Sequence, residues 1–236
     1  MIEGVKYAEI NDLDSVEALL NEKTAAIIVE PVQGEGGVYV CSKEFLTGLR
    51  KLCDERDIAL ILDEVQCGMG RTGTIMTYFQ YDILPDILCL AKGIGAGFPM
   101  GAFVANKKFA VAMEPGDHGS TYGGNPMAGQ ACRTVFKILE DTKMIDHVQD
   151  ISEYLIEKLD DLQEEFPCIK ERRGLGLMIG LEFDKPVKDI VKTCLDLGLI
   201  VVTAGPHVVR MLPPFITTEK DVDQAIAILK EAIEKN

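Results

Sequence analysis

The stretch IALILDEVQCGMGRTGTIMTYFQYDILPDILCLAK (58–92) contains two short apolar runs, and each is followed at once by a charged residue. The first run ends at Asp63 and the second ends at Lys92. Continuous runs of about five aliphatic residues are typical of strands that are buried on both faces. The segment between them is long enough for one crossover, so the stretch predicts two neighbouring parallel strands.

Segments on both sides extend this pattern. We expect a strand at 25–30, a helix at 43–56 that Ser42 caps, and a strand at 102–105 that could run antiparallel to its neighbour. Apolar strands that alternate with crossovers predict an α/β domain over residues 1–150, with a mostly parallel sheet and helices on both faces.

The pattern changes in the last third of the chain. Residues 151–236 predict a small C-terminal α+β domain with its own short sheet. The helices expected after the first domain's strands are 126–141, 144–166, 187–197 and 219–235, and the strands are 177–183, 199–203 and 208–212.

The composition narrows the possible partners. The net charge of −14 argues against a nucleic-acid partner or an anionic membrane surface, because both require a basic face. No apolar run approaches about 18 residues and the first residues lack the apolar core of a signal peptide, so we expect no membrane span and no secretion. The 7 cysteines include no CxxC pair and are expected to be reduced packing residues of a cytoplasmic protein.

A charged residue stands at the end of each of three expected strands: Glu30, Asp63 and Lys92. In open parallel sheets, ligands bind beyond the carboxyl ends of the strands. A single acid at a strand end is more often a turn or helix-cap residue. Three such residues, each beside a loop rich in glycine or turn residues, favour a binding site.

Lys92 opens the segment KGIGAGFPMGA, whose glycines let the backbone approach a ligand closely. We expect its amine to be partly buried, which lowers the pKa of a lysine and suits it to form a Schiff base. A phosphate-binding P-loop does not fit, because its lysine follows the glycines and precedes Ser or Thr. The simpler alternative is a surface lysine, which the preceding apolar run disfavours.

Asp63 is expected to be a buried carboxylate, which requires a cationic partner. A protonated pyridine nitrogen is such a partner, and its protonation makes the ring a better electron sink. Asp63 and Lys92 together therefore predict a pyridoxal phosphate site, in which one residue holds the ring nitrogen and the other holds the aldehyde carbon.

Five motifs resemble those of the class-III (fold-type I) aminotransferases, enzymes that depend on pyridoxal 5'-phosphate, and they occur in the same order. They are VEPVQGEGGV (29–38), LDEVQCGMGRTG (62–73), LAKGIGAGFPMGA (90–102), HGSTYGGNP (118–126) and VVRMLPP (208–214). The resemblance implies part of the family's large domain, followed by its small C-terminal domain.

The resemblance also implies a role for each matching residue. Lys92 resembles the lysine that binds the cofactor's aldehyde and moves a proton, and Asp63 resembles the partner of the ring nitrogen. Gln66 resembles the side chain that bonds the cofactor's 3'-oxygen, and Val65 resembles one that packs on a ring face. Thr121 resembles the residue that reaches the phosphate of a neighbouring subunit's cofactor, which implies a homodimer with shared sites.

Arg210 and Glu35 resemble a pair that serves two substrates, an amino acid and a 2-oxo acid. Arg210 resembles the guanidinium that binds a substrate carboxylate in a bidentate fork. Glu35 resembles the acid that pairs with this arginine while an amino substrate is bound. The alternative for Arg210 is an ordinary surface ion pair, and its place on an apolar strand argues against it.

Within the family, AGPHVVRMLPP (204–214) and GDHGSTYGGNP (116–126) look more like acetylornithine aminotransferases than ornithine or 4-aminobutyrate aminotransferases. The implied reaction converts N-acetylornithine and 2-oxoglutarate to N-acetylglutamate semialdehyde and glutamate, a step of arginine biosynthesis. Succinylornithine and succinyldiaminopimelate are alternative substrates of the same pocket.

Family members carry roughly 150 further residues ahead of the region matched here, about one domain's worth. That segment supplies a phosphate-binding loop, an aromatic ring stacked on the cofactor and another arginine. The resemblance thus leaves open a fragment of an active enzyme, a split enzyme completed by a separate N-terminal chain, and a non-catalytic dimerisation module. A nucleotide-binding Rossmann domain fits less well, because no GxGxxG follows the first strand.

Overall fold

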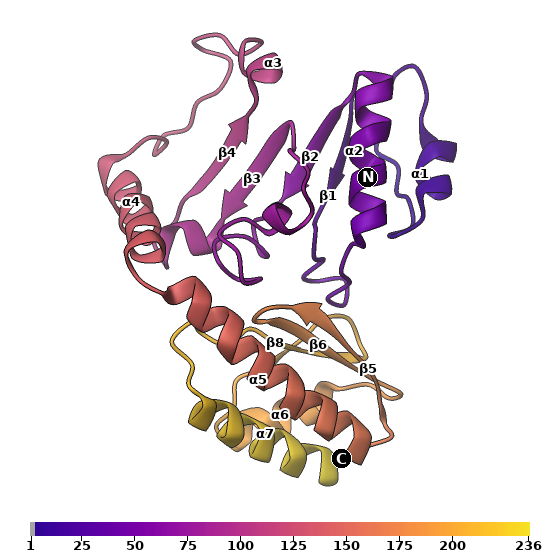
Figure 1. Ribbon diagram of the computed structural model, residues 1–236, viewed down its shortest axis with the longest axis vertical. Coiled ribbons are helices and arrows are strands. Elements are labelled where there is room, and N and C mark those ends of the chain that lie inside the picture. The colour runs from indigo at the N-terminus through magenta and orange to yellow at the C-terminus, as the bar shows by residue number, and fades with distance from the viewer. Residues whose placement is uncertain (1–2) are drawn as a thin grey trace.

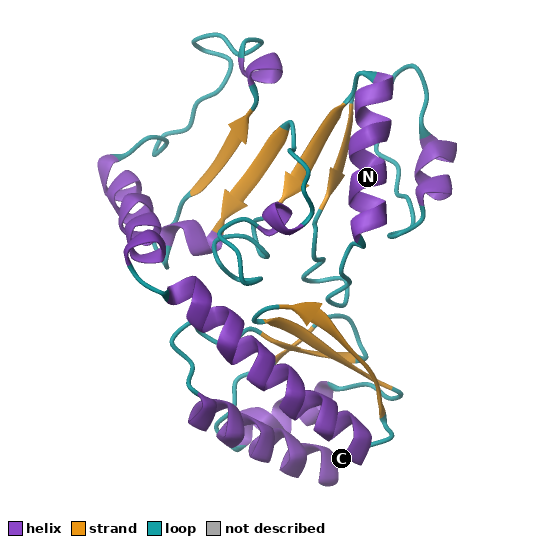
Figure 2. Ribbon diagram, in the orientation of Figure 1, coloured by secondary structure: helices purple, strands orange, loops and turns teal. Residues whose placement is uncertain are grey.

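The computed structural model describes residues 3–236, which form two units, each built on its own four-stranded sheet (Figures 1 and 2). The elements of the first unit are α1 (Leu13–Leu19), β1 (Ala26–Val29), α2 (Lys43–Arg56), β2 (Ala59–Asp63), η1 (Thr77–Gln80), β3 (Ile87–Ala91), η2 (Lys92–Gly95), β4 (Gly101–Ala105), α3 (Lys107–Ala110) and α4 (Pro126–Asp141). Those of the second are α5 (Met144–Glu165), β5 (Ile169–Leu175), β6 (Met178–Phe183), α6 (Lys188–Asp196), β7 (Val202–Thr203), β8 (Val208–Met211) and α7 (Glu219–Glu234).

The first sheet has the order β1-β2-β3-β4, with β1, β2 and β3 parallel and β4 antiparallel at the edge. The expected parallel strands and the antiparallel fourth strand are therefore confirmed. The crossover expected between β2 and β3 contains one regular element, the short 3₁₀ turn η1. Gly70 and Gly73 adopt positive φ in this crossover, and glycine disfavours a helix there.

Helix α2 packs on one face of this sheet, as its apolar stripe requires. Phe45, Leu49 and Leu52 of α2 bury against Leu60 of β2 and Leu88 of β3. The N-terminus of the helix is capped as expected, since the Ser42 side chain accepts a hydrogen bond from the Phe45 amide at 3.0 Å.

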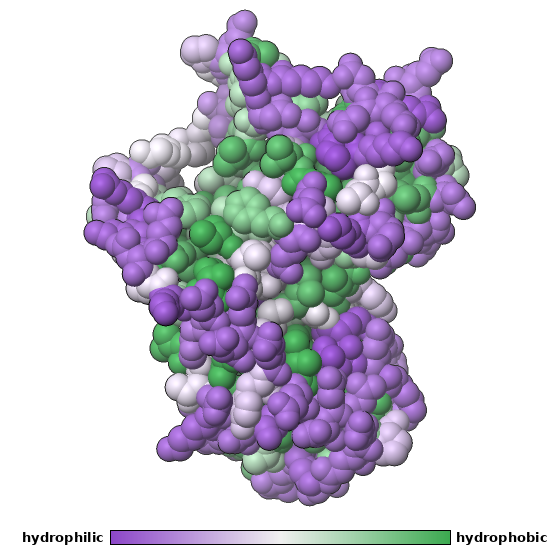
Figure 3. Space-filling model, viewed as in Figure 1, coloured by the Kyte–Doolittle hydropathy of each residue, from purple (hydrophilic) through white to green (hydrophobic). Residues whose placement is uncertain are grey.

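The opposite face differs from the expectation of helices on both sides. Ile28 on this face is 64% exposed, and the neighbouring Ile61 and Ile87 are only half-buried. Phe103 of β4, which pairs with Cys89 of β3, is 45% exposed. In the view of Figure 3, apolar residues also gather at the surface over β3 and β4. Within residues 3–236, the chain thus covers one face of its first sheet with a helix and leaves the other largely open.

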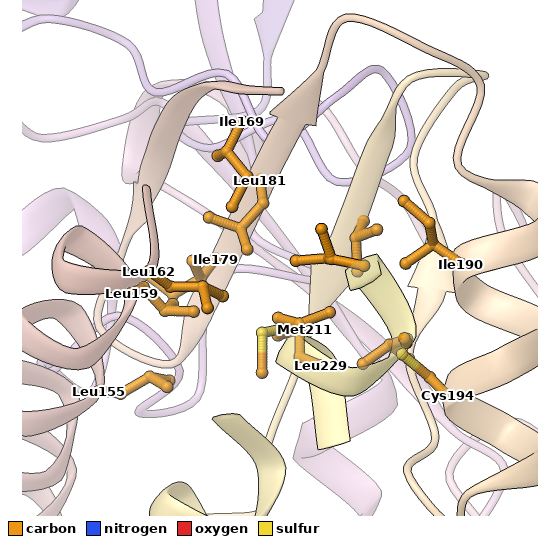
Figure 4. Close-up of a cluster of buried hydrophobic side chains, with 14 of the residues drawn as sticks. Leu155, Leu159, Leu162, Ile169, Ile179, Leu181, Ile190, Cys194, Met211 and Leu229 are labelled. Atoms are coloured by element: carbon orange, nitrogen blue, oxygen red, sulfur yellow. The ribbon is translucent and has the colours of Figure 1, made fainter. Parts of the chain in front are cut away.

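The second unit is an antiparallel sheet in the order β5-β6-β8-β7, covered by three helices. Helices α5, α6 and α7 supply one side of a continuous apolar core, shown in Figure 4. The boundary expected near residue 150 lies inside α5, and the core extends back to Val148. From Val148 onward α5 therefore packs with the second unit, whereas Met144 and Ile145 in its first turn pack against the core of the first unit. None of the helices described for residues 3–236 is both long and apolar enough to cross a bilayer.

Candidate active site

The carboxyl ends of β1, β2 and β3 lie at one edge of the first sheet, because the three strands are parallel neighbours. Glu30 directly follows β1, Asp63 is the last residue of β2, and Lys92 directly follows β3. The fold thus brings Glu30, Asp63 and Lys92 to the same edge, as expected from the sequence. Residues 3–236 hold no cluster of three or more His, Cys, Asp or Glu side chains suited to a metal ion.

Asp63 is half-buried, and its Oδ1 accepts a hydrogen bond from the Val65 amide at 3.0 Å. None of the ion pairs found among residues 3–236 includes Asp63. The described part of the chain therefore fixes one oxygen of this carboxylate and supplies no cation for the other. Such a carboxylate suits a positively charged ligand atom.

Lys92 is exposed, so the expectation of a partly buried amine is wrong for the described residues. The turn η2 begins at Lys92, directly after β3. The residue has a φ of 49°, a left-handed conformation that costs a non-glycine residue about 1–2 kcal/mol. Backbone strain of this kind is concentrated at functional sites.

Glu30 brings a further carboxylate to this edge. Burial raises its pKa, as do the charges of Asp63 and Glu35, whereas a hydrogen bond from the Gly34 amide and the charge of Lys92 lower it. These opposing effects show that the four side chains share one electrostatic environment. The edge therefore combines one exposed amine with several carboxylates.

The segment that follows Glu30 is a hairpin, residues 31–41, which reaches from the first sheet toward the second. Val32 and Val40 pair as an isolated antiparallel bridge, and the Gln33 amide donates to the Tyr39 carbonyl at 2.8 Å. The tip carries Glu35, whose side chain is 77% exposed. The hairpin thus presents an acid between the two units.

Arg210 of β8 meets the tip of this hairpin from the second unit. Its Nη1 donates to Glu35 Oε1 at 2.7 Å and to Gln66 Oε1 at 3.0 Å. The amide nitrogen of Gln66 in turn donates to Glu35 Oε1 at 3.4 Å. Three candidate residues from three distant parts of the chain therefore form one polar cluster.

The two members of this ion pair differ in exposure. The side chain of Arg210 is 9% exposed, and its Nε is buried without a hydrogen-bond partner. Hydrogen bonding and charge from Arg210 hold the pKa of Glu35 below its ordinary value. The arginine is thus fixed and incompletely satisfied, whereas the glutamate can rotate into solvent.

Gly34 lies where the hairpin crosses Gln66. A Cβ at this position would lie 2.2 Å from Gln66 Oε1, which is closer than any real contact. Glycine therefore allows the hairpin backbone to lie against the Gln66 amide.

The other two candidate residues occupy different places. Val65 follows the end of β2 and is half-buried beside Asp63. Thr121 is exposed in the segment between α3 and α4, and none of the hydrogen bonds among residues 3–236 joins it to the other candidates. The chain by itself does not bring Thr121 into the cluster.

Arg173 of β5, which no sequence pattern indicated, holds the same hairpin through the Gly37 carbonyl. The only signal was an arginine next to a glycine in a stretch that was not expected to be a strand. Glu64, a fully buried carboxylate directly after Asp63, was likewise not indicated by the sequence.

Comparisons with known proteins consistently indicate one family. A family model described as "Aminotransferase class-III" matches residues 3–233. The acetylornithine aminotransferase of Clostridium acetobutylicum is 46% identical over 234 residues, which cover 99% of this chain and 60% of that protein. The succinylornithine transaminase of Yersinia enterocolitica is 41% identical over 236 residues, 98% of this chain and 57% of that protein.

Solved structures show the same likeness. The crystal structure of N-acetylornithine aminotransferase from Stenotrophomonas maltophilia superposes with a TM-score of 0.88 at 36% identity, covering 98% of this chain and 62% of that one. The chain spans about 60% of the length of the curated relatives it matches.

Proposed function

Because the chain belongs to the class-III aminotransferase family, we propose that it binds pyridoxal 5'-phosphate and transfers an amino group from an amino acid to a 2-oxo acid. The observation that carries this proposal is the Arg210–Glu35 pair at the edge that also holds Asp63 and Lys92. A transaminase must bind two different substrates in turn, and a buried arginine with an exposed acid on it serves that purpose.

The residues present fit this cofactor. Asp63 has no cationic partner within the described part of the chain, and a protonated ring nitrogen would supply one. Lys92 offers an exposed amine in a strained backbone at the next strand end. When bound, pyridoxal phosphate supplies an electron-withdrawing ring that stabilises negative charge on the substrate carbon.

Each residue would then have a separate task. The Lys92 amine would hold the cofactor's aldehyde carbon and move the proton at the substrate carbon that bears nitrogen. Asp63 would keep the ring nitrogen protonated, because a carboxylate favours the charged form of its partner. Val65 would contact a ring face. Gln66, whose amide group already lies in the polar cluster, would bond the 3'-oxygen.

Arg210 would bind the carboxylate of the 2-oxo acid or of glutamate. A guanidinium matches a carboxylate with two parallel hydrogen bonds, and the buried Nε of Arg210 still lacks an acceptor. Glu35 would cover Arg210 when the amino donor has no carboxylate for it. Because Glu35 is largely exposed, it can leave without unpacking a core.

We propose N-acetylornithine as the amino donor and 2-oxoglutarate as the acceptor, a step of arginine biosynthesis. The names of the similar curated proteins, an acetylornithine aminotransferase and a succinylornithine transaminase, support an acylated ornithine over ornithine itself. We also propose a homodimer with shared sites, in which the exposed Thr121 reaches the partner's cofactor phosphate.

The first test is the absorbance spectrum of the purified chain with added pyridoxal phosphate, before and after borohydride. We expect a new band near the visible edge and a reduced adduct that peptide mapping places on Lys92. Lys92→Ala should abolish both, whereas Lys51→Ala, which alters an exposed lysine of α2, should not. If both variants keep the adduct, the cofactor labels surface lysines at random, and the proposal is contradicted.

The second test compares amino donors. Turnover of N-acetylornithine with 2-oxoglutarate should exceed that of ornithine and of 4-aminobutyrate, and succinylornithine should be the nearest competitor. Preference for ornithine or 4-aminobutyrate would overturn the proposed substrate. A Lys92 adduct without turnover of any donor would instead favour a chain that requires a separate N-terminal polypeptide.

A further inference from the structure

Two arginines of the second sheet lie in one row across its strands. Arg173 of β5 pairs with Gly180 of β6, and Gly180 pairs with Arg210 of β8. Residues that are directly opposite in neighbouring strands point to the same face. Arg173 and Arg210 therefore flank a glycine on the face that meets the hairpin at residues 31–41.

Arg173 holds the backbone of this hairpin. Its Nε donates to the Gly37 carbonyl at 2.7 Å, and its guanidinium carbon lies 4.0 Å from the centre of the Tyr39 ring. The side chain of Arg173 is 8% exposed, and its Nη1 bonds to both Glu171 and Glu182. A buried guanidinium fixed by two carboxylates is a rigid point of attachment.

Gly180 leaves the space that the hairpin fills. Val38 is fully buried beside it, and a Cβ on Gly180 would lie 2.9 Å from Val38 Cβ and 3.0 Å from Cγ2. Val38 has a φ of 58°, an unfavourable conformation for a β-branched residue. Packing over Gly180 and the Arg173 contact together hold this strained turn in place.

We propose that Arg173 and Gly180 position the hairpin so that Glu35 covers Arg210, and thereby set how strongly the site discriminates between a dicarboxylate and an amine substrate. This inference rests on the proposed role of Arg210 as the carboxylate-binding residue. Arg173 is a positioning residue, because it contacts Gly37 and Tyr39 and not Arg210 itself.

The physical reason is that one part of the hairpin is fixed while another part can rotate. Gly37 and Val38 are fixed to the second sheet, while Glu35, two residues from Gly37, keeps an exposed side chain. With the backbone fixed, the Glu35–Arg210 contact opens by rotation of one side chain. A loosened hairpin would place Glu35 on Arg210 less often, so a dicarboxylate would meet less competition.

The test compares Arg173→Lys with Arg172→Lys. Arg172 is the adjacent residue of β5, and it pairs with Asp160 of α5 on the other face of the sheet. Lysine keeps the charge but lacks the guanidinium fork, whose Nε bonds Gly37 while its Nη1 bonds the two carboxylates. Hydrogen–deuterium exchange of residues 33–40 should become faster in Arg173→Lys and should be unchanged in Arg172→Lys.

The second measurement is the dissociation constant of glutarate, an unreactive dicarboxylate, by calorimetry. In Arg173→Lys, glutarate should bind about threefold to tenfold more tightly than in the parent chain, because Glu35 competes less for Arg210. A change that merely damaged the fold would weaken binding. In a Glu35→Gln background, Arg173→Lys should have no effect on glutarate, since the competing charge is already gone.

Gly180→Ala provides an independent variant that keeps every charge. Its added Cβ should displace Val38, speed exchange of residues 33–40 and tighten glutarate binding as Arg173→Lys does. Gly129→Ala is the matched control, because a Cβ there meets nothing within 4 Å.

The outcomes distinguish the positioning role of Arg173 and Gly180 from the carboxylate-binding role of Arg210. Unchanged exchange in both Arg173→Lys and Gly180→Ala would overturn the positioning role. Faster exchange with unchanged or weaker glutarate binding would overturn the link to discrimination. If neither the parent chain nor Glu35→Gln binds glutarate, the carboxylate role of Arg210 fails, and the inference about discrimination fails with it. Even then, the exchange data alone still decide whether Arg173 holds the hairpin.

Discussion

At the scale of single residues, Glu64 is a buried acid that the proposed chemistry does not use. Its two carboxylate oxygens accept the Thr77 and Tyr78 amides, each at 2.7 Å. These bonds attach the end of β2 to the start of η1, and so close the crossover that carries Val65 and Gln66. Burial raises the pKa of Glu64 to about 7, although these hydrogen bonds partly oppose the effect of burial.

This pKa predicts how stability depends on pH. The carboxyl of an unfolded chain titrates near 4.5, so between that pH and about 7 the folded protein keeps a proton that the unfolded chain has released. Stability therefore falls as the pH rises through this window. The full effect is about 3 kcal/mol at most, because a tenfold difference in proton affinity between the folded and unfolded states corresponds to about 1.4 kcal/mol.

Urea unfolding at pH 5 and pH 8 measures this contribution. The side chain of Glu64→Gln is neutral at both pH values. The parent should therefore lose more unfolding free energy than the variant between pH 5 and pH 8. At pH 5 the variant should already be less stable, by about 1–3 kcal/mol, because an amide cannot accept both backbone hydrogen bonds. A pH-independent difference would show that Glu64 titrates normally.

At the scale of elements, one carboxylate ties together helix α2 and strands β2 and β4. Asp86 accepts hydrogen bonds from Arg50 Nη1 at 2.9 Å, from the Leu60 amide at 2.8 Å and from Asn106 Nδ2 at 2.6 Å. Arg50 belongs to α2, Leu60 to β2, and Asn106 directly follows β4. Arg50 and Asp86 are both largely buried, and removal of Asp86 leaves Arg50 paired only with the exposed carboxylate of Asp54.

Asp86→Ala should therefore destabilise the first unit by about 3–5 kcal/mol, the usual cost of breaking a buried ion pair by removing one partner. Asp82→Ala is the matched control, because Asp82 pairs with Lys43 at an exposed site and solvent screens that pair. Chemical denaturation of both variants checks the prediction. Equal stabilities would mean that Asp86 is already solvated.

The sequence predicted elements whose apolar period is plain and whose ends carry a recognisable cap. Helix α4 begins at Pro126 and ends at Asp141, as expected, and α2 begins after Ser42. It did not predict β5, because one of the two buried residues of that strand is Arg173, whose charge hides the alternation. Helix α1 was missed since it is short and buries only Val16.

The candidate site shows the same limit. Strand ends followed by charged residues predicted that Asp63 and Lys92 share an edge, because neighbouring parallel strands require it. The exposure of Lys92 could not be predicted in this way, since exposure depends on which other segments cover the ends of the strands. The contacts of Arg173 with the hairpin join residues 136 positions apart, and no local pattern encodes such a pair.

At the scale of the whole molecule, the two units are joined where the turn between β5 and β6 meets the crossover after β2. The Leu177 amide donates to the Arg71 carbonyl at 2.9 Å, and Arg71 Nη1 donates to the carbonyls of Leu177 and Pro213 at 3.2 and 2.5 Å. Arg71 also lies over the Phe215 ring at 4.6 Å. We expect this joint to fix the spacing between Gln66, on the first unit, and Arg210, on the second.

Gly176 lies at the closest point of this joint. A Cβ there would lie 2.6 Å from the carbonyl carbon of Thr72 and 2.7 Å from the carbonyl oxygen of Arg71, and both are backbone atoms that cannot rotate away. Gly176→Ala should force the two units apart. Gly198→Ala is the matched control, because Gly198 also has a positive φ, 95°, but open space around it.

Both variants introduce alanine at a left-handed residue, which costs each about 1–2 kcal/mol. Only Gly176→Ala adds the contact with Arg71 and Thr72, so it should be less stable than Gly198→Ala by about 1–3 kcal/mol in urea unfolding. It should also speed hydrogen exchange at Leu177, whose amide crosses the joint. Equal stability and equal exchange would show that the two units do not depend on this contact, and the spacing between Gln66 and Arg210 would then have to be set by the hairpin on the second sheet.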